Sequence, residues 1–297
     1  MRRPSVATAS VVAGGDPLRQ SERFCERMAR REAKNFYWGF VSLPRDQRIA
    51  IYALYDLARQ IDDEADAAGV DLGDLPRRLN AYRERVRECA SARYSDPITH
   101  VLSHAIKRYQ IPEVELQMLI DGVEMDAACT RYETWEDLQR YCTLVASVVG
   151  RMCVRIFGFD DPLALRFADE LGLALQLTNI LRDVREDASL GRIYLPAEDL
   201  RRFGILEADI LDGSVPMAWE RLIAFETQRA RSLFDRGYGV LAHIPRRAAA
   251  CVRTMAGIYE HILCMIEDDP QLPLRERASL SRTQKLRIMV GSWLRPM

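Results

Sequence analysis

The sequence has few of the residues that build metal clusters or disulfide frameworks. Its seven cysteines include no C-x-x-C pair and follow no regular spacing, so neither a zinc site nor a disulfide framework is expected, and a reducing cytoplasm is the expected compartment. His100 and His104, two of only four histidines, lie four residues apart but lack the adjacent glutamate of a zinc-protease helix. We interpret them as part of an ordinary helix face.

Long apolar runs and an excess of one charge are also missing. No stretch approaches the roughly 18 consecutive apolar residues that a membrane-spanning helix needs. The formal net charge of −1 gives no basic footprint for a nucleic-acid partner. The N-terminal stretch MRRPSVATASVVAGGD has two arginines but only a short, interrupted apolar part. Residues 1–17 are therefore expected to be a disordered leader rather than an export signal.

Signals for β-strands are almost absent, whereas apolar residues recur at helical spacing in long blocks separated by prolines. This periodicity predicts helices at 18–34, 46–66, 75–91, 98–110, 113–127, 135–158, 162–187, 217–241, 246–267 and 277–293. The main irregular segment expected is 188–216, which contains the short extended piece RIYLP. Because no linker or repeat is visible, residues 18–297 are predicted to form one all-α domain.

The predicted helix 162–187 is apolar nearly all round but carries one polar stripe. The stripe consists of Gln176, Asn179, Asp183 and Asp187, whose offsets of 0, 3, 7 and 11 place them on one helix face. The two aspartates lie at the C-terminal end, where the helix dipole disfavours negative charge. Burying an unpartnered amide costs on the order of 1–3 kcal/mol and a carboxylate more, so these groups are expected to have a compensating partner.

A second helix ends in the same way. The apolar run IAIYALYDLARQI is followed by DDEAD, and Arg59, Asp62 and Asp66 share one face. Solvated helix ends are the alternative interpretation, but it does not explain why both acidic pairs end the most apolar helices. Two D-x-x-x-D pairs without a nearby histidine or cysteine favour a hard ion such as magnesium, held by few carboxylates plus substrate phosphates. With an apolar cavity between them, the pairs indicate a diphosphate on a hydrocarbon tail.

At these residues the sequence resembles the squalene/phytoene synthases. The stretch ARQIDDEAD is similar to their first aspartate-rich motif, and QLTNILRDVRED followed by GRIYLPAEDL is similar to their second motif and its adjoining flap (here residues 191–200). Further matches are NFYWGFVSLPRDQR, DGVEMD, YETWEDLQRYCTLVASVVGRM and IYEHILCMIEDDP. The resemblance covers roughly residues 20 to 287.

The resemblance implies an all-α isoprenoid synthase fold, in which one helical domain surrounds a central apolar cavity. It implies a magnesium-dependent prenyltransferase, with manganese as an alternative ion, that joins two allylic prenyl diphosphates head to head. The donor loses its diphosphate, and the double bond of the acceptor attacks the resulting cation to give a cyclopropylcarbinyl diphosphate after proton loss. Some members stop there. Others rearrange this product to a linear hydrocarbon, and NADPH is needed where that hydrocarbon is squalene.

The resemblance also implies roles for individual residues. The magnesium ligands would be Asp62, Asp66, Asp183 and Asp187, with Asp62 and Asp183 counted as catalytic. The residues that line the reaction centre would be Tyr141, Gln176 and Asn179. The residues that contact the substrate would be Arg59, Lys34, Phe36, Arg182, Arg192, Tyr259 and Arg277, with Arg185 as a further diphosphate candidate. Core packing is the alternative role for the two tyrosines.

One segment departs from the family pattern. Some members have a histidine-serine pair where this chain reads REAKNFYW, and Lys34 offers a cation there instead. The segments RREAKNFYWGF and DGVEMDAACTRYETWEDL are most similar to the bacterial presqualene-diphosphate type of the hopanoid branch, which condenses two farnesyl diphosphates. Phytoene synthases of carotenoid biosynthesis, which use two geranylgeranyl diphosphates, share the motifs and are the alternative.

Two other classes of protein are more distant alternatives. A class I terpene cyclase usually has hydroxyl and glutamate ligands in its second metal motif, and DVRED lacks them. A non-catalytic relative would be expected to have lost an aspartate, and all four are present. The C-terminal LRIMVGSWLRPM is too short to span a bilayer and is expected either to lie at the inner membrane surface or to dock on the protein. The oligomeric state is left open.

Overall fold

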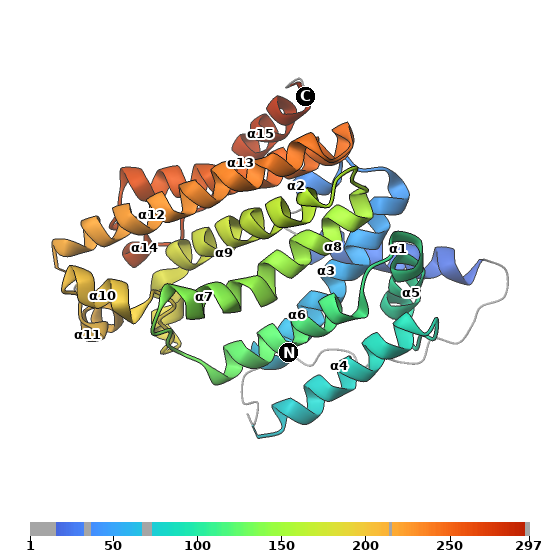
Figure 1. The fold of residues 1–297 in the computed structure, drawn as a ribbon, viewed down its shortest axis with the longest axis horizontal. Coiled ribbons are helices and arrows are strands. Elements are labelled where there is room, and N and C mark those ends of the chain that lie inside the picture. Colours follow the sequence, from blue (N-terminus) through green and yellow to red (C-terminus); the bar gives the residue numbers. More distant parts are fainter. Residues whose placement is uncertain (1–15, 33–36, 67–72, 214–215, 295–297) are drawn as a thin grey trace.

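The computed structural model describes residues 16–32, 37–66, 73–213 and 216–294, and these are predominantly helical (Figure 1). The long helices are α1 (Pro17–Glu32), α3 (Arg45–Asp66), α4 (Leu75–Ala90), α5 (Pro97–Tyr109), α6 (Glu113–Ala128), α7 (Trp135–Cys142), α8 (Val148–Phe157), α9 (Leu163–Ser189), α12 (Ala218–Gly237), α13 (Arg246–Asp268) and α15 (Arg282–Leu294). The short helices are α2 (Tyr37–Phe40), α10 (Ala197–Phe203), α11 (Glu207–Asp212) and α14 (Leu272–Arg275).

The predicted helices are confirmed to within a few residues, with three corrections. The segment 188–216 is not irregular throughout, because it contains α10 and α11. The predicted helix 135–158 is interrupted by a π-helical turn at Thr143–Ser147, and the predicted helix 217–241 ends in a 3-10 turn at Tyr238–Ala242. The leader lies almost wholly outside the described residues, since α1 begins at Pro17.

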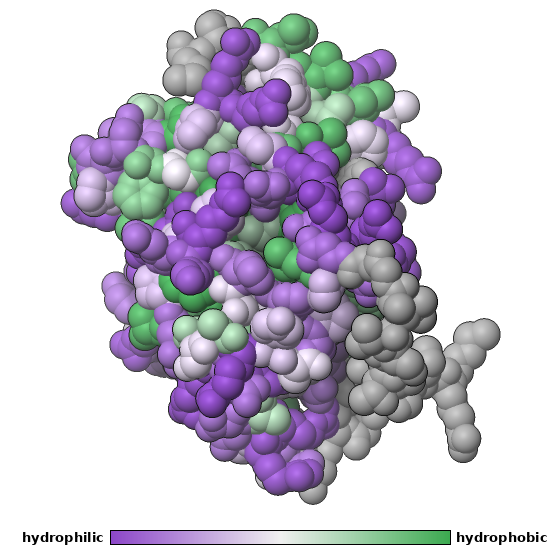
Figure 2. Space-filling model, turned by 90° about the vertical axis from the view of Figure 1, so that its right-hand side faces the viewer, coloured by the Kyte–Doolittle hydropathy of each residue, from purple (hydrophilic) through white to green (hydrophobic). Residues whose placement is uncertain are grey.

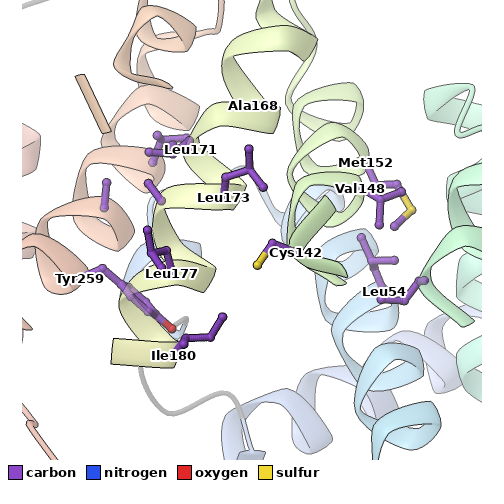
Figure 3. Packing of buried hydrophobic residues seen from close by; sticks show 14 of the residues in the cluster. Leu54, Cys142, Val148, Met152, Ala168, Leu171, Leu173, Leu177, Ile180 and Tyr259 are labelled. Atoms are coloured by element: carbon purple, nitrogen blue, oxygen red, sulfur yellow. The ribbon is translucent and has the colours of Figure 1, made fainter. Parts of the chain in front are cut away.

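The polar helix of the sequence analysis, α9, lies in the middle of the molecule. Figure 1 shows it between α7 and α8 on one side and α12 and α13 on the other. Its 27 residues extend over about 40 Å. Figure 3 shows its leucines between Tyr259 of α13 and the side chains of Cys142 and Val148. A helix covered on several sides needs apolar residues all round, which explains its composition.

Two glycines let neighbouring elements approach α9 closely. A Cβ atom on Gly172 would lie 2.6 Å from the Cα atom of Ser147 in the π-helical turn. A Cβ atom on Gly237 of α12 would lie 2.7 Å from the backbone nitrogen of Leu171. Backbone atoms on both sides leave no room for a methyl group, so these positions fix how α12 and the π-helical turn pack on α9.

The flap is tied to the segment that precedes α7. The amide of Ile193 donates to the carbonyl of Thr130 at 3.1 Å, and Arg131 forms an isolated parallel bridge with Ile193. The amide of Ala197 then donates to the carbonyl of Tyr132 at 2.9 Å. The short extended piece RIYLP is thereby confirmed, and it brings the chain after α9 back over the start of α7.

The surface is mostly polar, with local apolar patches. In the view of Figure 2, apolar residues gather at the upper end, where α15 lies. Leu286, Val290 and Trp293 of α15 are each more than two-fifths exposed, whereas Ile288 packs against the core. Within the described residues, α13 is the one helix long and apolar enough to cross a membrane, but 61% of its apolar window is buried inside the protein. That burial is typical of a core helix.

Candidate active site

A largely apolar cavity runs beside α9. It contains about 870 Å³ of atom-free space, part of which is open solvent at its mouth. The apolar lining comes mainly from α8, α9, α13 and the π-helical turn, and its few polar members include Gln176, Asn179 and Tyr259. The lining residues of α9 extend from Ala168 to Asn179, a rise of about 16 Å along the helix axis. The predicted central apolar cavity is thus confirmed, and two members of the polar stripe line it.

The two amides of the stripe contact each other. Nδ2 of Asn179 donates to Oε1 of Gln176 at 3.2 Å. The carbonyl oxygen of Asn179 is buried and has no hydrogen-bond partner. Such an acceptor is rare in a native protein and costs on the order of 1–3 kcal/mol. An unpaired carbonyl dipole beside an apolar cavity is suited to stabilise a positive charge inside it.

Tyr259 closes this part of the cavity from α13. The side chain is 3% exposed and lines the cavity (Figure 3). Burial raises the pKa of its phenol, and the guanidinium of Arg182 acts in the opposite direction. Tyr259 is therefore part of the core and part of the cavity wall, and its predicted contact with substrate stays a prediction.

Asp183 lies between two arginines at the polar end of α9. Nε and Nη2 of Arg182 donate to its two carboxylate oxygens at 2.7 and 2.5 Å. Nε of Arg277 lies 2.9 Å from Oδ1 of Asp183, and its Nη1 lies 3.3 Å from Glu186. A second pocket of about 500 Å³, open to solvent, adjoins these groups and is lined also by Arg185. Three of the arginines predicted to contact substrate, Arg182, Arg185 and Arg277, thus line the pocket at Asp183, whereas Arg59 lies at the first aspartate pair.

Asp187 lies one turn further along α9, in surroundings that disfavour the ionised form of its carboxyl. Burial raises the pKa of its carboxyl to about 7, the nearby charges of Asp183 and Asp126 act in the same direction, and Arg192 opposes them. The raised pKa indicates that the carboxyl of Asp187 is poorly solvated and lies close to other negative charges. Oxygen donors with such an excess fit a divalent cation, which would remove the repulsion.

The first aspartate pair lies at the end of α3. Asp62 accepts from Nη1 of Arg59 at 2.8 Å, and Nη2 of Arg59 lies 2.9 Å from Asp63. Asp66 is the last residue of the helix, and its side chain lies outside the described part of the chain. Figure 1 shows α3 and α9 ending towards the same side of the molecule. That the two pairs face each other across one substrate stays a prediction.

Among the described residues, no group of three or more cysteine, histidine or acidic side chains is preassembled as a complete metal site. Magnesium is usually held by a few carboxylates together with substrate phosphates. Among the described residues, Asp183 and Asp187 are carboxylates one helical turn apart at the end of α9, and such oxygen ligands fit this ion.

Tyr141 belongs to a cluster of three tyrosines that the sequence analysis did not foresee. Its ring centroid lies 5.5 Å from those of both Tyr132 and Tyr194, and the latter two lie 5.8 Å apart. The hydroxyl of Tyr194 donates to Oδ1 of Asp126 at 2.6 Å. The motifs DGVEMD and GRIYLPAEDL contain Asp126 and Tyr194, so the sequence held the signal, although only the fold shows that these motifs meet.

The remaining candidates differ in their placement. Nη1 of Arg192 lies 3.6 Å from Oδ2 of Asp126, at the edge of the same site. Arg185 donates to the carbonyl of Arg275, which ties α9 to α14. Lys34 and Phe36 lie outside the described residues, so their predicted contacts with substrate stay predictions.

Comparison with known proteins agrees with this geometry. Residues 29–284 match the family described as squalene/phytoene synthase. The chain belongs to the squalene/phytoene synthase family. Members of this family are prenyltransferases, so the predicted enzyme class is confirmed together with the family resemblance.

Relatives of this squalene/phytoene synthase family member align with nearly its whole length. A phytoene synthase of Mycobacterium bovis is 36% identical over 93% of this chain and 91% of its own length. A 15-cis-phytoene synthase of Synechococcus elongatus is 32% identical over 96% of this chain and 94% of its own. These relatives support the family without deciding which prenyl diphosphate this member uses.

Solved structures of the family confirm the isoprenoid synthase fold. The crystal structure of squalene synthase HpnC from Alicyclobacillus acidocaldarius matches with a TM-score of 0.80 at 33% identity, over 84% of this chain and 94% of that one. A dehydrosqualene synthase in complex with a ligand matches with a TM-score of 0.84 at 26% identity, over 93% and 98% of the two chains. The all-α architecture predicted from the sequence is the one these structures share.

Proposed function

We propose that this prenyltransferase joins two allylic prenyl diphosphates head to head. One observation carries the proposal: a single face of α9 leads from an apolar cavity, past the paired amides of Gln176 and Asn179, to the carboxylates of Asp183 and Asp187. The order along the helix matches the order of parts in a prenyl diphosphate, namely the hydrocarbon tail, the allylic carbon that becomes a cation, and the diphosphate.

The residues of the chain then have separate tasks. The apolar lining binds the tails and excludes water from the reacting carbons. The unpaired carbonyl of Asn179 and the ring of Tyr259 lie where positive charge would develop, and a carbonyl dipole or an aromatic face stabilises a cation without bonding to it. Arg182 and Arg277 can receive the departing diphosphate, because a guanidinium binds phosphate oxygens in a bidentate manner.

Magnesium, or manganese in its place, would be held by the aspartates of the two pairs and would supply electrostatic stabilisation of the leaving diphosphate. This assignment is supported by the environment of Asp187, where burial first, and then the nearby charges of Asp183 and Asp126, raise the pKa of the carboxyl. Per reaction, the bond from the donor's allylic carbon to its diphosphate breaks, and that carbon forms a first bond to the acceptor's double bond. The same carbon then loses one proton and uses the freed electron pair to form the second bond, which closes the cyclopropane ring.

For the substrate, we propose two farnesyl diphosphates with presqualene diphosphate as the product. The N-terminal and DGVEMD segments support this reaction, and so does the similarity to squalene synthase HpnC. Two geranylgeranyl diphosphates and phytoene are the second candidate, which the phytoene synthase names of the curated relatives favour. NADPH would be required only if the enzyme carried its product on to squalene.

Product analysis tests both candidates. The purified protein is incubated with farnesyl or geranylgeranyl diphosphate and magnesium, with and without NADPH, and the products are separated by chromatography and mass. Presqualene diphosphate is the expected product, chelation with EDTA should abolish it, and magnesium or manganese should restore it. A cyclic hydrocarbon from one diphosphate would indicate a terpene cyclase. Absence of turnover together with absence of chelator-sensitive binding would contradict an enzymatic role.

We also propose that the enzyme works in the cytoplasm at the inner membrane surface. The described helix α15 carries Arg282, Lys285 and Arg287 but no acidic residue, and it exposes Val290 and Trp293. A helix with basic and exposed apolar residues suits an anionic lipid surface. Its inner face packs on α13, so docking on the protein and contact with lipid are compatible.

A further inference from the structure

Asp126, near the end of α6, contacts side chains from two other elements. Its Oδ1 accepts a hydrogen bond from Tyr194 at 2.6 Å, and its Oδ2 lies 3.6 Å from Nη1 of Arg192. Burial raises the pKa of the Tyr141 phenol in α7 well above its usual value, and the nearby carboxylate of Asp126 acts in the same direction. The Asp126 side chain is itself only 17% exposed.

These contacts differ in strength. The bond from Tyr194 is short and involves a charged acceptor, which makes it one of the stronger hydrogen bonds in a protein. The 3.6 Å separation from Arg192 is an ion pair but is longer than a normal N–H···O hydrogen bond. Exchanging the ion pair between Arg192 and Asp126 for another anion would therefore cost less than releasing Tyr194 from Asp126.

Both partners belong to the chain just after the second aspartate pair. Arg192 lies five residues after Asp187, and its backbone amide donates to the carbonyl of Asp187 at 2.9 Å, so Arg192 is near the proposed diphosphate site. Tyr194 stacks on Tyr141 with 5.5 Å between ring centroids. A single carboxylate thus connects the flap that carries Arg192 with the cluster of Tyr132, Tyr141 and Tyr194.

We propose that Asp126 is a positioning residue. It holds the flap closed over the site through Tyr194, orients Tyr141, and keeps Arg192 beside Asp187 by an ion pair weak enough to be exchanged for a substrate diphosphate. The last part rests on the proposed function, because it needs a diphosphate to receive Arg192. The contact between Asp126 and Tyr194 that holds the flap does not depend on the proposed function. Its effect on the flap can be measured without substrate.

The alternative is that Asp126 contributes only to stability. The backbone hydrogen bond from the amide of Ile193 to the carbonyl of Thr130 distinguishes the two roles. It lies in the flap and involves neither the Asp126 nor the Tyr194 side chain, so hydrogen exchange at this amide reports on the flap itself. A positioning role predicts faster exchange of the flap amides when Asp126 is changed, with little change elsewhere. A purely structural role predicts lower stability of the whole protein without a selective effect on the flap.

The test uses the variants Asp126→Asn, Tyr194→Phe and the two combined. It compares them with the control variant Asp121→Asn. Asp121 is on the same helix, is half-exposed and pairs with Arg83, so its variant controls for the loss of a charge from α6. Hydrogen exchange of the substrate-free protein is followed by mass spectrometry. Exchange in residues 191–196 should rise about tenfold or more in Asp126→Asn, because a charged hydrogen bond is lost there, and should be unchanged in Asp121→Asn.

Turnover is measured on the same proteins. The kcat should fall about tenfold to a hundredfold in Asp126→Asn, and the double variant should be within about twofold of it, because Tyr194 acts through Asp126. Unchanged flap exchange in Asp126→Asn, or additive losses of kcat in the double variant, would overturn the proposal. If Asp126→Asn does not fold, Tyr194→Phe alone must still loosen the flap. An inactive wild type would contradict the proposed function, while flap exchange would still decide the role of Asp126.

Discussion

Arg277 and Asp183 lie 94 residues apart in the chain, yet Nε of Arg277 is 2.9 Å from Oδ1 of Asp183. This contact ties the loop between α14 and α15 to the polar end of α9, and it places a half-exposed guanidinium at the second aspartate pair. The carboxylate of Asp183 is therefore held by two arginines, Arg182 and Arg277. Diphosphate and cation binding would have to redistribute these partners, so both residues should affect turnover.

Asp183→Asn should lower kcat about a hundredfold to a thousandfold or more, because it removes a charged group from the site where the leaving diphosphate is stabilised. Steady-state kinetics with saturating magnesium would show the loss. Asp160→Asn is the matched control, since Asp160 is 77% exposed and pairs with His243 away from the α9 stripe. Full activity of Asp183→Asn would refute the assignment of this residue as a metal ligand.

Arg277→Gln should raise the KM for the prenyl diphosphate and the inhibition constant of inorganic diphosphate about tenfold, since a charged hydrogen bond to phosphate is lost. Arg277→Lys should recover part of the affinity, because it keeps the charge but not the bidentate geometry. Arg236→Gln serves for comparison, as Arg236 has the same degree of exposure and pairs with Glu170 on the surface. Equal effects of the two glutamine variants would argue against a substrate contact for Arg277.

Gly172→Ala should lower the free energy of unfolding by about 1–3 kcal/mol, because the new methyl group would lie 2.6 Å from the Cα atom of Ser147 and neither helix backbone can move freely. Thermal unfolding followed by circular dichroism would measure it. Gly257→Ala on α13 is the control, because its methyl group would meet a single side-chain atom, Cγ2 of Ile288 at 3.0 Å, and no backbone atom of another element. That variant should be neutral or slightly stabilising, and a similar loss in both would contradict the tight approach at Gly172.

Stability should also depend on the ionisation of Glu226, a fully buried residue of α12. Its carboxylate accepts from Arg229 at 2.6 Å, but burial dominates and raises the pKa to about 7. Because the folded protein then retains a proton that the unfolded chain has lost, stability falls as pH rises from about 4.5 to about 7, by at most about 3 kcal/mol.

Glu226→Gln removes this titration, so the wild type should lose stability relative to the variant across that pH range. Urea unfolding of both proteins at pH 5 and pH 8, in buffers of equal ionic strength, would measure the difference. A stability difference that is independent of pH would show that the carboxyl of Glu226 titrates alike in the folded and unfolded states.

Replacing Trp293 or Val290 by serine should reduce binding to anionic vesicles several-fold, because each removes exposed apolar area from α15. Co-sedimentation with phosphatidylglycerol vesicles measures it, and high salt should weaken the binding of the wild type. Val114→Ser changes a valine on α6 that is more exposed than Val290, and it should have no effect. Equal binding by all variants, or none by the wild type, would count against a lipid-facing role for α15.

The periodicity of the sequence by itself determined the helical fold and the polar stripe of α9. Apolar residues at helical spacing can be buried efficiently only as packed helices, and Gln176, Asn179, Asp183 and Asp187 share a face for geometric reasons alone. The short helices α10 and α11 were missed because six or seven residues carry too little periodicity to be distinguished from a loop.

Contacts between distant segments were decided only by the tertiary structure. The pairing of Arg277 with Asp183, and the meeting of Asp126 with Tyr194, join residues that are 94 and 68 positions apart. Local spacing cannot specify such pairs, because they depend on how α6, α9 and the flap pack against one another. The sequence therefore determined which chemical groups the site contains. The packing of the helices decided which of them touch and how deep a cavity they surround.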